Sequence, residues 1–334
     1  MSAPFSWIRP EPWGVHVIPA DCWVDPGRAV DRALVTHGHA DHARGGHGEN
    51  IATPETLAIM ELRYNTREGA TPVQYNETIK LRGGVDATFI PAGHVLGSAQ
   101  ILLEHAGERV IITGDYKRRA DPTCAPFKVA PCDIFITEAT FGLPVFTHPP
   151  IEDEITKLIG ALAAHPDGCV LIGAYALGKA QRVIAELRAS GHSAPIYLHG
   201  AMEKMCRLYE EHGVPLGDLR LVSDHTKDDM RGSIVVAPPS ALNDRWARRL
   251  PEAITAMASG WMRVRGRARQ RGVELPLVIS DHADWNELTR TIDEVNPAET
   301  WITHGREEAL LRWCELGQRK ARALALVGRE DEDE

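Results

Sequence analysis

Short apolar runs rich in β-branched residues recur along this chain, and each is followed by a loop that contains glycine. Such runs occupy residues 33–35, 87–90 and 109–112, and a fourth occupies residues 300–303. Runs of this length and composition predict buried strands, and the glycines that follow them predict turns. The pattern therefore predicts four strands that each end in a loop, at widely separated places in the chain.

In the middle of the chain the pattern changes to alternating helical and strand segments. Three prolines between Pro144 and Pro150 mark the crossing into this region. Helices are predicted at 151–165, 179–189 and 202–212, and strands at 169–173, 194–198 and 233–237. Such alternation implies a parallel sheet with helices on its faces. Leu275–Ser280 is expected to return the chain to the first domain.

Composition is consistent with a large folded protein. The 334 residues, 43% of them hydrophobic, can bury a large core and form one large or two medium domains. No run of 18 apolar residues and no charged-then-apolar leader occurs, so we expect a soluble cytoplasmic protein. The six cysteines are scattered without a C-x-x-C pair, which indicates reduced thiols that are not needed as ligands.

Charge is distributed unevenly. The net charge is −9, but residues 330–334 are all acidic and are expected to form a disordered tail. Between 263 and 271, arginine occupies every second position. An extended segment would place these arginines on one face, whereas a helix would spread them around its axis. The run is either a solvated charged face or a groove that contacts a phosphodiester backbone through Arg263, Arg265 and Arg267.

The most informative polar pattern directly follows the run at 33–35. Three imidazoles and a carboxylate fall within six positions, at His37, His39, Asp41 and His42. Residues two apart point the same way, so His37 and His39 can bind one ion while Asp41 and His42 turn toward a second. Nitrogen ligands with a hard carboxylate suit zinc or manganese. The alternative is a polar loop that happens to be rich in histidine. With 15 histidines in 334 residues, however, four metal-type residues in this arrangement are very unlikely by chance.

The other predicted strands also lead into metal-type residues. His94 follows the run at 87–90, Asp115 follows 109–112, and His304 follows 300–303. A single histidine or aspartate at a strand end is usually structural or a helix cap. The cluster at 37–42 strengthens the case for these three as further ligands, lying on loops at the same edge of a sheet.

Six motifs in this order resemble the metallo-β-lactamase superfamily and, within it, the β-CASP nuclease branch. They are His37–His42, Gly93–Ser98, Thr113–Asp115, Thr137–Gly142, Ser280–Asp284 and Thr303–Gly305. Residues 170–182 also resemble the strand–loop–helix of the inserted β-CASP domain, so the resemblance covers nearly the whole chain. Bacterial ligase-associated DNA exonucleases, relatives of Artemis-type nucleases and of ribonuclease J, are the group it resembles most.

The resemblance implies an α/β protein with a discontinuous first domain. A metallo-β-lactamase αββα sandwich is expected at 1–143 and 278–329, with a β-CASP α/β domain inserted at 144–277. Two metal ions are implied, zinc or manganese. His37, His39 and His94 would hold one, Asp41, His42 and His304 the second, and Asp115 would bridge them.

Chemistry and resemblance together assign the remaining roles. A hydroxide between the two ions is the expected nucleophile, because metal ions lower the pKa of bound water toward about 7. His282 is the candidate general acid for the leaving sugar oxygen, and Glu138 would hold its ring. Asp41, His282 and Glu138 are thus the predicted catalytic residues. Lys117 and Arg118 could line the approach for phosphates, although surface charge is the alternative.

Three functions fit this pattern. The first is a metal-dependent DNA exonuclease in DNA repair, with DNA as partner and a functional association with a ligase and a helicase. The second is a ribonuclease of the same branch, because a histidine such as His304 is typical of RNA-processing members. The third, a small-molecule hydrolase, is disfavoured by the long insert between Glu138 and His282. A catalytically inactive scaffold is disfavoured by the full ligand set.

Overall fold

The computed structural model describes residues 5–66 and 69–324, and the chain divides into two compact units. Unit 1 consists of Met1–Thr147 and His282–Glu334, and unit 2 of His148–Asp281. Both contain helices and strands, which confirms the α/β class. The acidic segment 330–334 lies outside the described residues. Within the described residues, no helix combines the length and the apolar character that crossing a membrane requires.

Unit 1 contains two sheets. The first has the order β1 (Ile8–Glu11), β2 (Gly14–Val17), β3 (Cys22–Val24), β4 (Arg32–Leu34), β5 (Glu49–Ala52) and β6 (Ala70–Pro72). The second has the order β19 (Ala321–Ala323), β18 (Glu299–Gly305), β11 (Ile134–Ala139), β10 (Glu108–Ile112), β9 (Ala99–His105), β8 (Asp86–Pro91) and β7 (Thr78–Lys80). Each of the four runs predicted as strands lies in one of these sheets.

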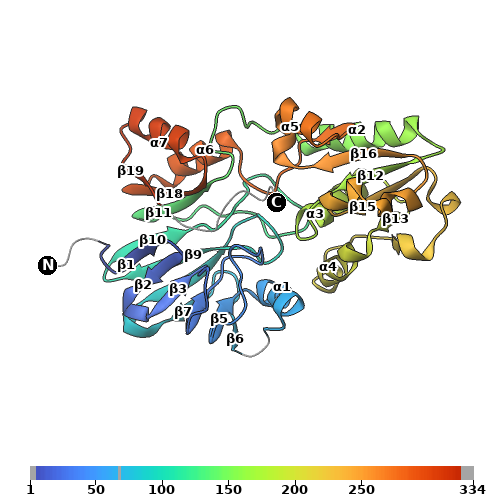
Figure 1. Cartoon of the computed structure of the whole chain (residues 1–334). Coiled ribbons are helices and arrows are strands. Elements are labelled where there is room, and N and C mark those ends of the chain that lie inside the picture. The colour runs from blue at the N-terminus through green and yellow to red at the C-terminus, as the bar shows by residue number, and fades with distance from the viewer. Residues whose placement is uncertain (1–4, 67–68, 325–334) are drawn as a thin grey trace. The chain divides into compact units, whose positions relative to one another are not determined.

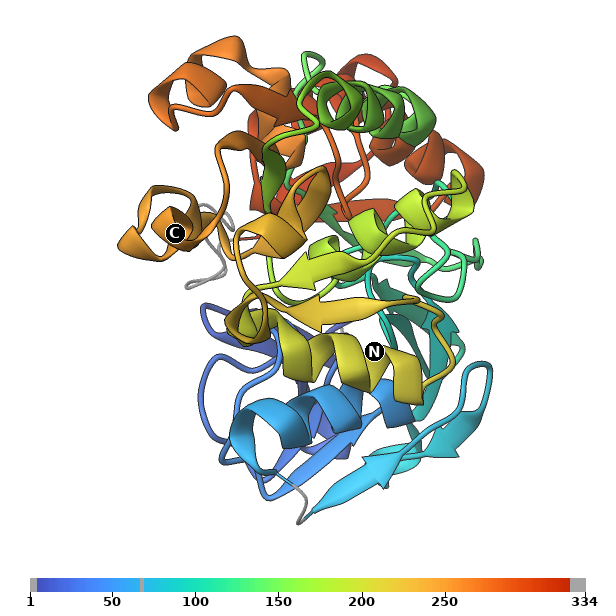
Figure 2. The ribbon, with the colours of Figure 1, turned by 90° about the vertical axis from the view of Figure 1, so that its right-hand side faces the viewer.

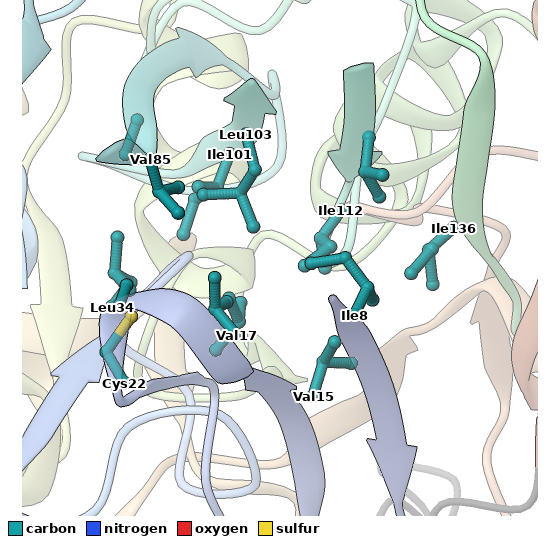
Figure 3. Close-up of a cluster of buried hydrophobic side chains, with 14 of the residues drawn as sticks. Ile8, Val15, Val17, Cys22, Leu34, Val85, Ile101, Leu103, Ile112 and Ile136 are labelled. Atoms are coloured by element: carbon teal, nitrogen blue, oxygen red, sulfur yellow. The ribbon is translucent and has the colours of Figure 1, made fainter. Parts of the chain in front are cut away.

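The main core of unit 1 lies between its two sheets. Figure 3 shows Val15, Val17 and Leu34 of the first sheet facing Ile101 and Ile112 of the second. On β2 the side chains alternate, with both valines buried and the residue between them only half-buried, as a strand with one covered face requires. Fully burying one such side chain contributes about 1.5–3 kcal/mol. This interior therefore fixes the positions of the two sheets of unit 1, and of the loops at their ends, relative to each other.

Helices cover the outer faces of both sheets. Helix α1 (Pro54–Tyr64) packs Met60 against the first sheet, and Figures 1 and 2 show it lying beside β5 and β6. It begins at Thr53, whose hydroxyl accepts a hydrogen bond from the Thr56 amide. Helices α6 (Trp285–Val295) and α7 (Glu307–Leu316) pack against the second sheet. The layers of unit 1 are thus helix, sheet, sheet and helix.

Unit 2 is built on a parallel sheet, as the alternating pattern predicted. Its order is β14 (Leu219–Leu221), β13 (Ile196–Leu198), β15 (Ser233–Ala237), β12 (Cys169–Gly173), β16 (Ala253–Ala258) and β17 (Leu275–Leu277). Its helices are α2 (Ile151–Ala164), α3 (Lys179–Ala189), α4 (Gly200–Glu211) and α5 (Arg265–Gln270). Figure 2 shows α4 lying along this sheet.

One prediction for this region is wrong. Leu275–Ser280 was expected to return to the first domain, although the expected insert, 144–277, includes its first three residues; in the structure Leu275–Leu277 pairs with β16 as the edge strand of the unit 2 sheet. The segment stays in unit 2 as far as Asp281. Its pairing partner β16 was not predicted from the sequence, so no neighbour for it could be expected there.

Candidate metal centre

The candidate ligands lie on loops at one edge of the unit 1 sheets. Strands β10, β11 and β18 are mutually parallel, and β8 runs the same way because β8 and β10 both pair antiparallel with β9. His94 and Asp115 follow the carboxyl ends of β8 and β10, while His304 is the next-to-last residue of β18. The amide of Ala99 donates to the carbonyl of Thr36 at 2.8 Å, which joins the loop after β4 to the second sheet.

Two glycines allow these loops to approach closely. A side chain at Gly38 would meet the Cγ2 atom of Ile59 on helix α1 at 2.5 Å, so the residue between the first two histidines has no room for a Cβ. Gly114 has a φ of 56°, and a Cβ there would lie 2.5 Å from the Thr36 hydroxyl. Glycine adopts this left-handed conformation without strain. Gly114 thereby allows Asp115 to lie close to the loop that carries His37.

The predicted ligands gather in two groups whose ligand atoms lie within 4.8 Å of one another. The first comprises His37, His39, His94 and Asp115, and the second Asp41, His42 and His304. Asp115 faces both groups, because its Oδ2 atom lies 3.3 Å from His37 Nε2 and 3.4 Å from His42 Nε2. His94 Nε2 lies 3.0 Å from His39 Nδ1. These clusters could bind metal ions.

Unsatisfied buried atoms support this interpretation. Among the described residues, no hydrogen-bond partner exists for His37 Nε2, His42 Nε2 or Asp115 Oδ1, and all three atoms are buried. Buried polar atoms in folded proteins nearly always have a partner. Nitrogen and carboxylate atoms that converge without one are the donor set that a divalent transition metal accepts.

The electrostatics of the cluster favour the ligating forms. Burial lowers the pKa of His37 to about 4, helped by the neighbouring His42, so its imidazole is neutral and carries a free lone pair. Burial also lowers the pKa of His94 well below its usual range. For Asp115, burial acts in the opposite direction, but the surrounding imidazoles hold its pKa well below the usual range. Neutral imidazoles around an ionised carboxylate are the form that binds a cation.

His42 differs from the other imidazoles. Burial alone would lower its pKa, but the charges of Asp41, Asp115 and Asp25 raise it well above the usual range. Its Nε2 atom lies 3.2 Å from Asp41 Oδ2. A metal ion at this position would replace the proton, since ligands bind metals in their deprotonated form.

Asp25 was not identified from the sequence. It follows β3 directly, is fully buried and has a φ of 46°. Its Oδ2 atom lies 2.8 Å from His42 Nδ1 and accepts from the Thr36 hydroxyl at 2.6 Å, and its Oδ1 atom accepts from the Thr36 amide. Because Asp25 accepts a hydrogen bond from the Nδ1–H group of His42, the lone pair of this imidazole lies on Nε2, where it can bind an ion. The Asp25-Pro26-Gly27 sequence resembles an ordinary turn, so only the parallel pairing of β3 with β4 reveals this role.

Glu138 and His282 form a second buried pair beside the cluster. The Glu138 Oε2 atom lies 3.0 Å from His282 Nδ1, and Oε1 accepts from the Tyr116 amide at 2.7 Å. Ligand atoms of Asp115, Glu138 and His282 also lie within 4.8 Å of one another. The His282 ring is 4.6 Å from that of His94. This is the arrangement in which a carboxylate orients an imidazole; the catalytic role of the pair stays a prediction.

A β-bulge determines the position of His304. In the β11–β18 ladder Glu138 is opposite Thr303 but Ala139 is opposite Gly305, so His304 is the extra residue. Its φ of 59° is unusual for a residue with a side chain. Bulges change the direction in which a side chain points. Here the imidazole stacks on His42, with ring centroids 5.0 Å apart and an interplanar angle of 21°.

The residues predicted to bind substrate are divided between unit 1, which contains Lys117 and Arg118, and unit 2, which contains Arg263, Arg265 and Arg267. Lys117 is buried, and Arg118 donates to Thr291 and Glu294 at 3.0 and 2.6 Å. The arginine run is not extended: Gly260–Arg263 is a 3₁₀ turn and Arg265–Gln270 is helix α5. Its arginines therefore spread around a helix instead of sharing one face. Arg263 and Arg265 are exposed, and Arg267 lies over the Trp261 ring at 4.0 Å.

Comparisons with known proteins find several relatives, although no protein-family model matches the chain. A probable DNA ligase of Opitutus terrae is 31% identical over 316 residues, which cover 90% of this chain and 30% of that protein. Cleavage and polyadenylation specificity factor subunit 3-I of Arabidopsis thaliana is 24% identical, with 91% and 55% covered. Endoribonuclease YSH1 of Eremothecium gossypii is 38% identical over 170 residues, with 48% and 21% covered.

The chain therefore spans between 21% and 55% of the length of these three relatives. Among solved structures, a protein of unknown function from Enterococcus faecalis aligns with a TM-score of 0.57 over 84% of this chain and 76% of that one. Its sequence identity is 14%, so it indicates a shared fold and no more.

Proposed function

The chain fits the β-CASP branch of the metallo-β-lactamase superfamily, and from this premise we propose that it is a metal-dependent nuclease acting as a DNA exonuclease in DNA repair. The observation that carries the proposal is the buried cluster of imidazoles around Asp115, with the Glu138–His282 pair beside it. The relative named as a probable DNA ligase, aligned over 90% of this chain, supports DNA as the substrate and a ligase as a functional associate. Unit 1 would be the metallo-β-lactamase domain and unit 2 the β-CASP domain.

We propose two divalent ions, zinc or manganese. His37, His39 and His94 would hold one, Asp41, His42 and His304 the other, and Asp115 would be shared between them. When bound, such ions supply a hydroxide nucleophile near neutral pH and offset negative charge on the phosphoryl group. This assignment is supported by the imidazoles of His37, His42 and His94, whose Nε2 atoms lie 3.3 to 3.8 Å from Asp115 Oδ2.

The protein's own residues then complete the hydrolysis. Attack at phosphorus breaks the bond to the sugar oxygen, which takes the electron pair and needs a proton. The His282 imidazolium donates that proton from Nε2, while Glu138 accepts a hydrogen bond from Nδ1 and stabilises the charged ring. The Tyr116 amide donates to the other oxygen of Glu138 and so restrains the carboxylate that contacts the ring.

A cleavage assay on matched single strands tests the proposed function. End-labelled DNA and RNA of the same sequence would be incubated with zinc and manganese in turn, with Asp115→Ala as the inactive control. Faster metal-dependent loss of nucleotides from DNA supports the exonuclease, and the label position gives its polarity. Absence of cleavage in every condition, on substrates with and without a 5′-phosphate, would contradict a nuclease.

A ribonuclease is the second candidate, and His304 is the observation that favours it. A histidine in this motif is typical of RNA-processing members of the branch, and relatives of this chain are named endoribonucleases. In the same assay, faster cleavage of RNA than of DNA would assign the chain to this function.

The arginine run gives a first prediction. Changing Arg263, Arg265 and Arg267 together to glutamine should weaken single-strand binding and lower its salt dependence, by about 0.7 in the log–log slope per lost phosphate contact. Fluorescence anisotropy over a salt series without metal measures this. The matched control changes Arg207, Arg220 and Arg231, which are exposed in unit 2 and paired with acidic neighbours. If the salt dependence of binding is the same in this variant as in the control, the arginine run is a solvated charged face and does not contact the nucleic acid.

Asp25 gives a second prediction. Asp25→Asn keeps the side-chain shape but presents an amide N–H to His42 Nδ1, which forces the proton onto Nε2 and removes its lone pair. Affinity for the second ion should fall by about 10- to 100-fold, the usual effect of losing an outer-shell partner. Titration against a chelator measures this, with Asp121→Asn as a control buried elsewhere in unit 1. Unchanged affinity would show that Asp25 does not set the His42 tautomer.

A further inference from the structure

Lys117 is a buried lysine two residues beyond Asp115. Its side chain is 2% exposed, and its amino group donates to the backbone carbonyl of His282 at 3.0 Å. The same amino group lies 3.6 Å from Glu287 Oε2, which balances its charge. Lysine is almost never buried this completely unless it is paired. Both of these contacts are made with the segment that carries His282.

The loop after Asp115 contacts that segment at several consecutive residues. The Tyr116 carbonyl accepts from the Ala283 amide at 2.6 Å, and the Arg119 amide donates to Glu287 at 2.9 Å. The Tyr116 amide also holds Glu138. One short loop therefore fixes both the backbone of His282 and the carboxylate that orients its ring.

We propose that Lys117 is a positioning residue that holds the main chain of His282 so that its imidazole faces the leaving oxygen. This rests on the proposed function, in which His282 protonates the sugar oxygen as its bond to phosphorus breaks. The Tyr116–Ala283 hydrogen bond fixes one side of the His282 peptide, and the Lys117 amino group fixes the other. A phosphate contact is the alternative role for a basic residue here, and it requires an exposed amino group.

Two phosphodiesters with different leaving groups separate these roles. In DNA the leaving sugar oxygen needs a proton, whereas in bis(4-nitrophenyl) phosphate the nitrophenolate leaves as a stable anion. In Lys117→Met we expect kcat on single-stranded DNA to fall about 10- to 100-fold, as for other orienting partners. KM, the salt dependence of DNA binding and hydrolysis of the nitrophenyl ester should stay close to those of the unsubstituted protein.

The control is Lys80→Met, which removes a lysine of unit 1 whose side chain is 80% exposed and paired with Asp86. Bound metal and thermal unfolding are measured on each protein. If Lys117→Met does not fold, Lys117→Gln is compared in the same way, since its shorter neutral amide cannot replace the ammonium contact. In either variant Glu287 can still accept the hydrogen bond from the Arg119 amide.

Two results would overturn the proposal. A raised KM with a lower salt slope would make Lys117 a phosphate contact, and equal losses on both esters would make its effect general damage to the site. Failure of the proposed function is detected separately: if His282→Ala cleaves DNA normally, His282 is not the acid. Selective loss on DNA with unchanged metal content supports the positioning role.

Discussion

Asp115→Ala is expected to abolish hydrolysis of DNA and RNA and to reduce the bound metal below two ions per chain. Asp115 faces His37, His42 and His94, so both proposed ions lose a ligand when it is removed. Losing an outer-shell partner alone costs about 10- to 100-fold, and a shared ligand should cost more. Turnover and elemental analysis of the purified protein measure the two effects.

The fold should survive this substitution. Removing one partner of a buried ion pair typically costs about 3–5 kcal/mol, but His37 is neutral and His42 keeps Asp25 and Asp41 as partners. We therefore expect a loss of stability below that range and an unchanged circular dichroism spectrum. Asp86→Ala, in the same unit but outside the cluster, is the control. Full activity in folded Asp115→Ala would refute the two-metal arrangement.

Local patterns were sufficient to predict the strands that carry the centre. The runs that became β4, β8, β10 and β18 are short, apolar and followed by glycine, so strand and turn can both be inferred without knowing any partner. The alternation in unit 2 predicted its parallel sheet for the same reason. Where the signal lies within ten residues, as in the motif His37–His42, the sequence is enough to nominate the ligands.

What the sequence could not predict depends on distant pairing. Leu275–Leu277 belongs to unit 2 because it pairs with β16, and Asp25 reaches His42 because β3 lies parallel to β4. His304 points at His42 because a bulge forms against β11. The arginine spacing allowed either a strand or a helix, and the structure has helix α5. In the first three cases the deciding contact is a pairing with another strand, which the local pattern does not reveal.

The loop after Asp115 links the two halves of the proposed chemistry. It begins at the carboxylate shared by both metal groups, and its next residue holds Glu138, the partner of His282. Loss of a metal ligand and loss of the proton donor should therefore be separable by experiment only if each is measured with its own readout. Metal content reports on Asp115, and dependence on the leaving group reports on His282.

His282→Ala is expected to lower kcat on DNA by about 10²- to 10⁴-fold, the usual contribution of a general acid. Its Nδ1 atom is held by Glu138, and none of the predicted ligand roles uses its ring. Bound metal should therefore stay at the level of the unsubstituted protein. Hydrolysis of bis(4-nitrophenyl) phosphate should be largely retained, because its leaving group needs no proton.

This pattern distinguishes an acid from a ligand. The His282 ring lies 4.6 Å from that of His94, close enough that a direct role in metal binding is the competing explanation. A ligand role predicts lower metal content and equal losses on both esters. His105→Ala, a histidine of unit 1 outside the cluster, controls for the loss of an imidazole. Normal metal content together with a loss confined to DNA would leave proton donation as the only role that fits, because a missing ligand would impair both esters alike.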